Sequence, residues 1–199
     1  HAPLPGTQPP VRSLFVDRWG TLAELPAAGY ARCWKDVRFH DGAIDALFRA
    51  QQAGWRVYLI GNEDGVARGD LADEAWVALE SRLLAHLRTL GVLVRRNYAC
   101  LDHPEGRPPH KKPSVFRLPA TGLLYHAAPK DGVVLAASWV VGDSTLELAA
   151  GERAGCHVAA VRTGLGLGDR TLDVEPAMVC RDLVQTVQTL LGIEAYSQV

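Results

Sequence analysis

The stretch LFVDRWGTLAE, residues 14–24, places an aspartate directly after a short apolar run and before a Gly-Thr pair. A strand in the middle of a parallel sheet is buried on both faces, so it is typically a near-continuous apolar run. Residues 13–17 are therefore predicted to form a buried strand that ends in Asp17. Open α/β sheets bind ligands at the carboxyl ends of their strands, which makes Asp17 a candidate site residue. Trp19 stands two residues further on, where a site of this layout would usually have a second acid.

Segments with strand and helix character alternate along the rest of the chain. Apolar runs predict strands at residues 55–61, 93–100, 137–143 and 156–162, and apolar residues at helical spacing predict helices at 41–54, 73–91, 118–128, 145–155 and 181–192. Such alternation implies parallel strands joined by right-handed crossovers. We expect residues 11–199 to form one α/β domain around a doubly wound, mainly parallel sheet. A proline-rich, flexible arm is expected at residues 1–10.

Composition excludes several classes of partner. The 199-residue chain has a formal net charge of −1, so it has no basic surplus for nucleic acid or an anionic membrane. No apolar run approaches the roughly 20 residues of a membrane-spanning helix. The four cysteines lie far apart and form no disulfide framework, which favours a reducing, cytoplasmic location. A monomer is the default expectation.

The predicted strand ends bring polar groups to one edge of the sheet. These groups are Asp17, residues 61–64 (GNED), Cys100 and Asp143. One aspartate alone would be explained as a helix or turn cap, but two of them with Lys112 in an intervening loop favour a site. A carboxylate can attack a phosphoryl group, and Mg²⁺ usually needs only one or two carboxylates in addition to water. The residues therefore favour Mg²⁺-assisted phosphoryl chemistry, with a lysine to offset the phosphate charge.

Together these motifs resemble those of the haloacid dehalogenase (HAD) superfamily, subfamily IIIA, in its branch of heptose-bisphosphate and histidinol-phosphate phosphatases. DRWGTL stands where that branch has D-R-D-G-T-[LI], and GNEDGVARG where it has T-N-Q-S-G-[IV]-A-R-G. CLDHPEG resembles its C-P-H-H-P-E loop, KKP its R-K-P, and VGDSTLELAAGERAGC its V-G-D-x-x-x-D-x-x-A-G-x-x-A-G. The resemblance covers residues 14–192. It implies a HAD-like, Rossmann-like fold without a large cap domain.

The resemblance also implies a role for each matching position. Asp17 would be the nucleophile, and Lys112 would neutralise Asp17 and the phosphate. Mg²⁺ would be held by Asp17, Asp143 and the backbone carbonyl of Trp19, with Glu147 where the family often has a second acid. The substrate would be a small phosphorylated metabolite such as a sugar phosphate. The residues expected beside it are Arg18, Gly61, Asn62 and Arg68.

Two departures from the family pattern bear on activity. The family's second aspartate transfers a proton, which Trp19 cannot do, and such help is worth on the order of 10²–10⁴ in rate. Gly61 replaces a Thr or Ser that donates a hydrogen bond to the phosphoryl group, a loss of roughly 10²–10³. Glu63 or Asp64 could act as the acid and base instead, although both are also typical turn residues. On this interpretation Trp19→Asp raises hydrolysis, and Gly61→Thr helps less.

Three functions remain open from the sequence. The first is a phosphatase-type hydrolase with weak or altered activity. The second is a catalytically inactive relative that binds a phosphorylated ligand or a protein partner. The third is a metal-independent, dehalogenase-like hydrolase, because haloacid dehalogenases also carry an aromatic residue two positions after the nucleophile. The remaining motifs follow the phosphatase branch, which places the third function last.

The loop after residue 100 is where the family binds structural Zn²⁺, through C-x-H followed by C-x-C. Here only the first cysteine is present, and a tetrahedral zinc site normally needs four ligands. The conceivable zinc ligands are Cys100, Asp102, His103 and His110. This set is short of a standard site, so we expect substoichiometric zinc and a proline-stiffened loop at the mouth of the crevice.

Overall fold

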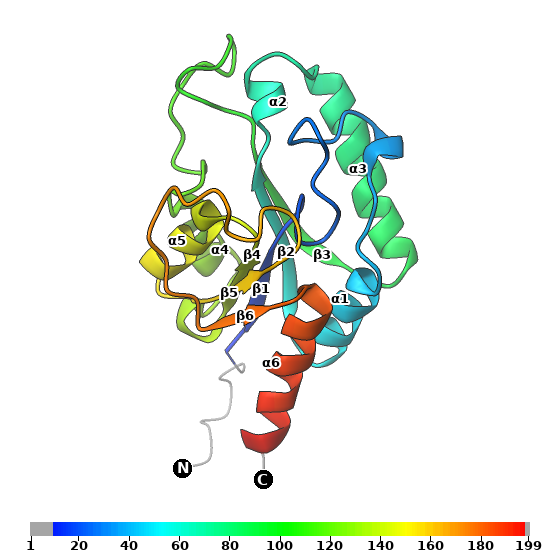
Figure 1. Cartoon of the computed structure of the whole chain (residues 1–199), viewed down its shortest axis with the longest axis vertical. Coiled ribbons are helices and arrows are strands. Elements are labelled where there is room, and N and C mark those ends of the chain that lie inside the picture. The colour runs from blue at the N-terminus through cyan, green and yellow to red at the C-terminus, as the bar shows by residue number, and fades with distance from the viewer. Residues whose placement is uncertain (1–9, 198–199) are drawn as a thin grey trace.

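The computed structural model describes residues 10–197, and the side chains of residues 10–192. The predicted arm therefore lies almost wholly outside the described residues. Six parallel strands form one sheet in the order β3-β2-β1-β4-β5-β6 (Figure 1). The strands are β1 (Ser13–Asp17), β2 (Arg56–Asn62), β3 (Val94–Cys100), β4 (Trp139–Gly142), β5 (His157–Val161) and β6 (Met178–Cys180). The helices are α1 (Ala43–Gln52), α2 (Asp64–Ala67), α3 (Asp73–Thr89), α4 (Gly122–Asp131), α5 (Thr145–Arg153) and α6 (Leu183–Ser197), with 3₁₀ helices at Trp34–Asp36 and Leu135–Ala137.

The doubly wound parallel architecture is confirmed, and all five predicted strands are present. The sequence analysis missed β6 and α2, which are only three and four residues long. It also started the helix predicted at 118–128 too early, because the corresponding helix, α4, begins only at Gly122. The last helix continues to Ser197, past the glycine at 192 where the sequence suggested that it ends. Among residues 10–197, no helix combines the length and the apolar character needed to cross a membrane.

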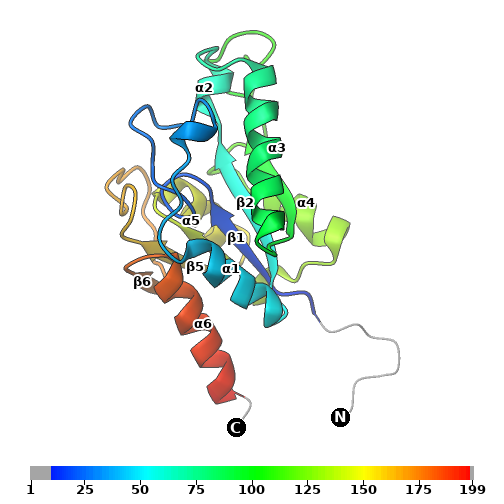
Figure 2. The ribbon, with the colours of Figure 1, turned by 90° about the vertical axis from the view of Figure 1, so that its right-hand side faces the viewer.

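Alternating side chains of the central strands fill two cores, one on each face of the sheet. On β1, Leu14 and Val16 join the core beneath α1 and α6, whereas Phe15 joins the core beneath α4 and α5. Figure 2 shows the first pair of helices on one side of the sheet. Because both faces are covered, the strands need apolar residues at every position, which explains the continuous runs in the sequence.

The strand order reverses direction between β1 and β4. From β1 the chain proceeds outward to β2 and β3, and then returns to β4 on the opposite side of β1. Connections that leave in opposite directions open a crevice at the carboxyl ends of the two strands. Asp17 closes β1 and Asp143 follows β4, so both predicted aspartates lie at this crevice.

A third, smaller core lies under the segment that connects β1 to α1. It contains Trp19, Val66, Trp76 and Leu79, with Tyr30 and other residues of the connection packed on it. Backbone hydrogen bonds close the connection on itself, from the Glu24 N–H to the Arg38 carbonyl at 2.7 Å. The connection is thus a packed loop beside α2 and α3, in agreement with the absence of a large cap domain.

Asp131 ties the end of α4 to the outer strands on the side of the sheet remote from the crevice. Its buried carboxylate accepts hydrogen bonds from the Tyr58 hydroxyl at 2.8 Å and from the guanidinium groups of Arg95 and Arg96 at 2.9 Å. These bonds, led by that from Arg96, hold the pKa of Asp131 well below its usual range. The ionised form is therefore stabilised by folding.

We expect Asp131→Ala to lower the free energy of unfolding by about 1–3 kcal/mol, because it leaves buried donors without a partner. Urea denaturation at pH 7 measures the change. Asp45→Ala is the control, since Asp45 forms only an exposed pair with Arg49 and should change stability by less than about 1 kcal/mol. Equal effects of the two substitutions would contradict a structural role for Asp131.

Because the folded-state pKa is lowered, the contribution of Asp131 is present above the ordinary pKa of 3.8 and is lost as the pH falls through the folded value. The difference between wild type and Asp131→Ala should therefore shrink in strong acid.

Candidate active site

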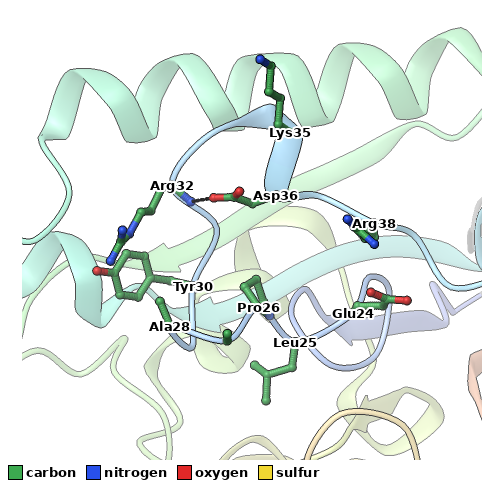
Figure 3. A pocket seen from close by; sticks show the side chains of 10 residues that line it. Glu24, Leu25, Pro26, Ala28, Tyr30, Arg32, Lys35, Asp36 and Arg38 are labelled. Carbon is green, nitrogen blue, oxygen red and sulfur yellow. Dashed lines mark hydrogen bonds between the residues drawn. The ribbon is translucent and has the colours of Figure 1, made fainter.

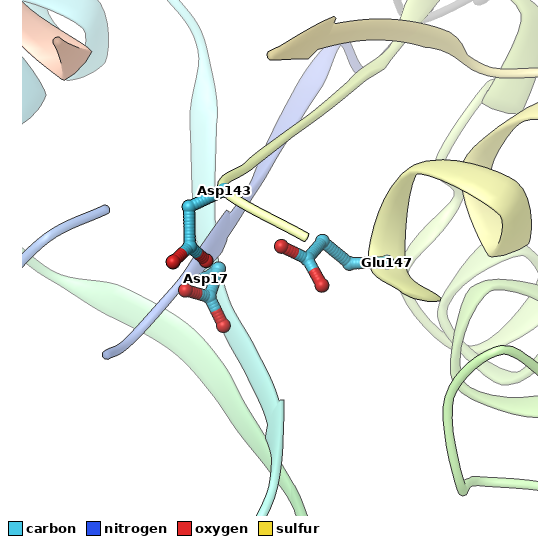
Figure 4. A group of neighbouring side chains, drawn as sticks. All are labelled: Asp17, Asp143 and Glu147. Atoms are coloured by element: carbon cyan, nitrogen blue, oxygen red, sulfur yellow. The ribbon is translucent and has the colours of Figure 1, made fainter. Parts of the chain in front are cut away.

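Three buried carboxylates meet at the crevice between β1 and β4. Asp17 ends β1, Asp143 follows β4, and Glu147 lies in the first turn of α5. One oxygen of each carboxylate lies within 4.8 Å of the others (Figure 4). Among residues 10–192, this is the only group of three or more acidic, histidine or cysteine side chains that close together. Their convergence confirms the strand-end argument for Asp17 and Asp143.

Hydrogen bonds from the backbone fix two of these carboxylates. The Leu165 N–H donates to Asp143 Oδ2 at 2.7 Å, and the Ser144 N–H donates to Glu147 Oε1 at 2.7 Å. Ser144 and Glu147 form a capping box at the start of α5. In contrast, Asp17 Oδ2 is buried and has no hydrogen-bond partner. The nucleophile candidate thus has a buried acceptor oxygen without a hydrogen-bond partner.

Glycines make room for this concentration of oxygen atoms. A Cβ on Gly20 would lie 2.0 Å from Asp143 Oδ2, and one on Gly164 would lie 2.1 Å from the same atom. A Cβ on Gly142 would lie 2.2 Å from Glu147 Oε1. The glycines of DRWGT and VGD therefore serve the close approach of backbone and carboxylate.

Burial and mutual repulsion make the ionised forms of the three acids unfavourable. Burial, followed by the charges of Glu147 and Asp143, raises the pKa of Asp17 well above its ordinary value, and Arg18 opposes the rise. Burial and the charge of Asp143 raise the pKa of Glu147 to about 8. A cation among them would relieve both effects. An all-oxygen site with a free acceptor on Asp17 fits Mg²⁺.

Arg18 was expected beside the substrate, but the structure buries it behind the crevice. Its guanidinium donates to Glu63 Oε1, Asn97 Oδ1 and the carbonyls of Tyr98 and Gly61, at distances from 2.8 to 3.0 Å. Arg18 Nη2 also lies 3.0 Å from Glu63 Oε1, as an ion pair. Four N–H groups of the guanidinium therefore donate to protein atoms. Arg18 joins the carboxyl ends of three strands, and its side chain is 1% exposed.

Gly61 lies against this guanidinium. A Cβ at this position would lie 2.8 Å from Arg18 Nη2 and 3.6 Å from Asp17 Oδ1. The space in which a Thr or Ser side chain would start is therefore occupied by Arg18. Gly61→Thr cannot simply restore a phosphate donor, because Arg18 would have to move first.

The Trp19 side chain is also turned away from the catalytic position. The indole is 7% exposed, packs in the third core, and donates from Nε1 to Glu63 Oε1 at 2.9 Å. The dehalogenase-like function stays an open alternative. Coordination of Mg²⁺ by the Trp19 carbonyl stays a prediction.

The two proposed substitute acids have different surroundings. Glu63 is fully buried, and its Oε1 receives Arg18 and Trp19, whereas its Oε2 has no hydrogen-bond partner. Burial raises the pKa of Glu63, and its action as an acid stays a prediction. Asp64 forms an ion pair with Arg117 at 2.6 Å, and the hydrogen bond from Arg117 lowers its pKa despite partial burial. Asp64 is thus held as a carboxylate, which is a poor general acid.

Asn62 and Arg68 have different surroundings from those expected. The Asn62 amide donates to the Leu118 carbonyl at 3.0 Å and accepts from the Leu118 N–H at 2.9 Å. It fastens the 101–118 loop to β2, so both ends of its amide are engaged away from a ligand. Arg68 is exposed at the end of α2. Contact between Arg68 and a substrate stays a prediction.

Lys112 is exposed on the 101–118 loop. Its Nζ lies 3.9 Å from Asp102 Oδ2. It lines a pocket of about 480 Å³ together with Cys100, His110 and Ser114. Arg18 is the cation that lowers the pKa of Asp17, so action of Lys112 on Asp17 or on a phosphate stays a prediction.

The four conceivable zinc ligands do not form a ligand set. Cys100 Sγ lies 3.6 Å from the Asp102 carbonyl, and His103 Nδ1 accepts the Glu105 N–H at 2.9 Å. His110 contacts carboxylates through both ring nitrogens, and these hydrogen bonds raise its pKa. The donor atoms thus have separate partners, and the loop does not fit the tetrahedral zinc site of the family.

The glycine-rich turn TGLGLGD, residues 163–169, is the part of the site that the sequence analysis missed. Leu165 donates to the Asp143 side chain, and Leu167 N donates to the Asp143 carbonyl at 2.7 Å. The Thr163 hydroxyl donates to the Gly20 carbonyl at 2.6 Å. The glycine cluster directly after a strand was visible in the sequence. Its function is to support the carboxylate, since the turn precedes no helix.

A larger pocket of about 610 Å³ lies in the connection between β1 and α1 (Figure 3). Its lining includes Tyr30, Arg32, Lys35 and Arg38 beside Glu24 and Asp36. In Figure 3 the Lys35 and Arg32 side chains point to different sides of the pocket. The charged groups therefore do not converge on one ligand position.

Comparison with known proteins agrees with this geometry. A family model described as HAD-hydrolase-like matches residues 115–186. The chain is 31% identical over 170 residues to the D-glycero-beta-D-manno-heptose-1,7-bisphosphate 7-phosphatase of Haemophilus influenzae, covering 81% of this chain and 91% of that protein. It is 30% identical over 190 residues to the D-glycero-D-manno-heptose-1,7-bisphosphate 7-phosphatase of Thermosynechococcus vestitus, covering 90% and 95%.

A solved structure is similar over nearly the whole chain. The D,D-heptose 1,7-bisphosphate phosphatase from B. bronchiseptica, in complex with magnesium and phosphate, has a TM-score of 0.81 at 27% identity, covering 92% of this chain and 99% of that one. These identities and coverages place the chain in the HAD superfamily, in agreement with its parallel sheet and its acidic cluster. Within it, the chain belongs to the branch of the heptose-bisphosphate and histidinol-phosphate phosphatases.

The raised pKa values predict a stability that depends on pH in metal-free protein. A folded-state pKa of about 8 for Glu147, against 4.5 when unfolded, means that the folded state holds the proton more tightly. Stability should then fall as pH rises between these values, by roughly 1.4 kcal/mol per pH unit for one proton. Thermal unfolding in EDTA at pH 6 and pH 8 measures the loss, and Mg²⁺ at pH 8 should reverse it. Glu147→Gln should flatten the dependence; an unchanged slope would remove Glu147 as its cause.

The position of the indole changes the expected effect of Trp19→Asp. The substitution removes a large core side chain and places a second carboxylate beside buried Glu63, so we expect a loss of roughly 3–5 kcal/mol in unfolding free energy. Trp19→Phe keeps the ring and should cost less, about 1–2 kcal/mol. Urea denaturation compares the two variants. A stable Trp19→Asp protein with faster hydrolysis would show instead that the third core tolerates the acid.

Proposed function

We propose that this chain is a Mg²⁺-assisted phosphatase-type hydrolase of a small phosphorylated sugar, with slow turnover. The observation that carries the proposal is the buried Asp17–Asp143–Glu147 cluster, with an unpaired oxygen on Asp17. Its relatives are named as heptose-bisphosphate 7-phosphatases, and one of them is described in complex with magnesium and phosphate. These names support the substrate class.

Each residue has a distinct part in the proposed reaction. Asp17 attacks the phosphorus atom, the bond from phosphorus to the sugar oxygen breaks, and the sugar leaves as an alcohol. The aspartyl-phosphate that remains is then hydrolysed by water to free Asp17 and inorganic phosphate. Asp17 and Asp143, with the Trp19 carbonyl, would hold Mg²⁺, and the ion would offset charge on the phosphoryl oxygens. The glycine turn at 163–169 orients Asp143 through the Leu165 N–H. Lys112 supplies the positive charge that faces the phosphate from the loop.

Slow turnover follows from the missing proton carrier. The Trp19 indole is in the core, Glu63 is fully buried with Arg18 and Trp19 on its Oε1, and Asp64 is held ionised by Arg117. Transfer from a good leaving group needs little protonation, so the first step can proceed. The second step needs a general base to activate water, and a good leaving group cannot replace that base. The aspartyl-phosphate should therefore accumulate.

The Arg18–Glu63–Trp19 network favours one alternative, a binding protein without turnover. It fills the space behind Asp17 with protein atoms. Trp19 and Gly61 stand at the two positions where the family has side chains on which catalysis depends. On this alternative, the crevice retains its cation and phosphate sites but releases its ligand unchanged. The two functions differ in whether Asp17 becomes phosphorylated.

Rapid-quench kinetics with an activated aryl phosphate and Mg²⁺ separates the two functions. We expect a burst of aryl alcohol approaching one equivalent per chain, followed by slow steady release, because formation of the aspartyl-phosphate outpaces its hydrolysis. Mass spectrometry of the quenched protein should place the phosphate on Asp17. Asp17→Asn is the control and should show neither burst nor adduct. Binding of phosphate without any burst would establish the binding protein in place of the hydrolase.

A further inference from the structure

We propose that His110 is a positioning residue, which clamps the 101–118 loop to α3 without a metal ion and thereby places Lys112. The part that concerns Lys112 rests on the proposed function. The clamp itself rests only on the contacts of His110 and its loop.

His110 bridges two carboxylates from separate elements. Its Nδ1 lies 3.1 Å from Asp102 Oδ1, in the segment after β3, and its Nε2 lies 2.8 Å from Asp73 Oδ2, in the first turn of α3. Both ring nitrogens therefore lie within hydrogen-bonding distance of a carboxylate oxygen. The ring is largely buried, with 14% of its side chain exposed. Charge-assisted bonds of this kind are roughly twice as strong as neutral ones.

The zinc that the family resemblance implies does not fit this arrangement. To bind a metal, His110 would have to leave at least one of its carboxylates, because both of its ring nitrogens contact one. Cys100 and His103 would also have to leave the Asp102 carbonyl and the Glu105 N–H. The His110 bridge instead supplies a connection between the loop and the rest of the domain.

Backbone hydrogen bonds connect Lys112 to His110 and His103. The His103 N–H donates to the His110 carbonyl at 3.0 Å, and the Lys112 N–H lies 3.0 Å from the same carbonyl and 3.2 Å from that of His103. The loop thus closes into a ring with Lys112 two residues after His110. At the other end of the segment, the Asn62 amide holds the Leu118 backbone. Both ends of the segment that carries Lys112 are therefore fastened.

Asp102 couples the clamp to the lysine side chain. One of its oxygens contacts His110 and the other lies 3.9 Å from Lys112 Nζ. Asp102, His110, Lys112 and Ser114 line the same pocket of about 480 Å³. Loss of His110 should therefore release both the backbone and the ammonium group of Lys112. It should weaken phosphate binding and leave the carboxylate cluster intact.

Hydrogen exchange measured by mass spectrometry tests the clamp without any ligand. In His110→Ala and in Asp73→Asn, backbone amides within residues 101–112 should exchange roughly tenfold faster than in wild type. Asp70→Asn is the matched control, an exposed acid three residues before Asp73, and should leave exchange unchanged. Unchanged exchange in His110→Ala would overturn the clamp.

Two further measurements complete the test. After incubation with zinc sulfate and dialysis, elemental analysis of wild type should find far less than one zinc per chain; one tightly held zinc, with exchange that EDTA accelerates, would overturn the metal-free clamp. Calorimetric titration of inorganic phosphate in Mg²⁺ should show affinity several-fold weaker in His110→Ala, with unchanged Mg²⁺ affinity. Unchanged phosphate affinity despite faster exchange would overturn the link to Lys112. If wild type binds no phosphate while exchange still responds, the proposed function fails and the clamp stands.

Discussion

Repulsion among three buried carboxylates is the constraint around which the crevice is built. Asp17, Asp143 and Glu147 approach one another because glycines at positions 20, 142 and 164 leave no Cβ in the way. Such a cluster is stable only if its charge is reduced by protons or offset by a cation. Arg18 offsets part of the negative charge, and protons or a cation from solvent must offset the remainder. Cation binding and the stability of the domain are therefore linked at this point.

Sequence patterns predicted the fold and the acidic centre because both depend on short-range rules. Apolar runs mark buried strands, and the carboxyl ends of parallel strands meet at one edge, which was enough to bring Asp17 and Asp143 together. The directions of Arg18, Trp19 and Asn62 depend instead on long-range partners, Glu63 and Leu118 among them. A motif letter shows which residue is present at a position, whereas burial and hydrogen bonding decide what its side chain contacts.

Two short elements escaped prediction for a different reason. The strand β6 has three residues, and the helix α2 has four, so neither is long enough to show a periodicity. The glycines of the turn at 163–169 are visible in the sequence, but the role of the turn depends on Asp143, which follows another strand. The Asp102–His110–Asp73 bridge likewise joins two separate parts of the chain, the 101–118 loop and α3. Contacts of this kind can be found only from coordinates.

The contacts of Arg18 also bear on the order in which the domain can assemble. Its partners lie 43 to 80 residues further along the chain, on β2 and β3 or just after them. During synthesis the N-terminal part emerges first, so the guanidinium stays hydrated until residue 98 has left the ribosome. The three-stranded half can then close around it before Asp143 and Glu147 exist. Asp143 and Glu147 come from the second half of the chain, so the crevice is complete only when β4 and α5 have joined the sheet.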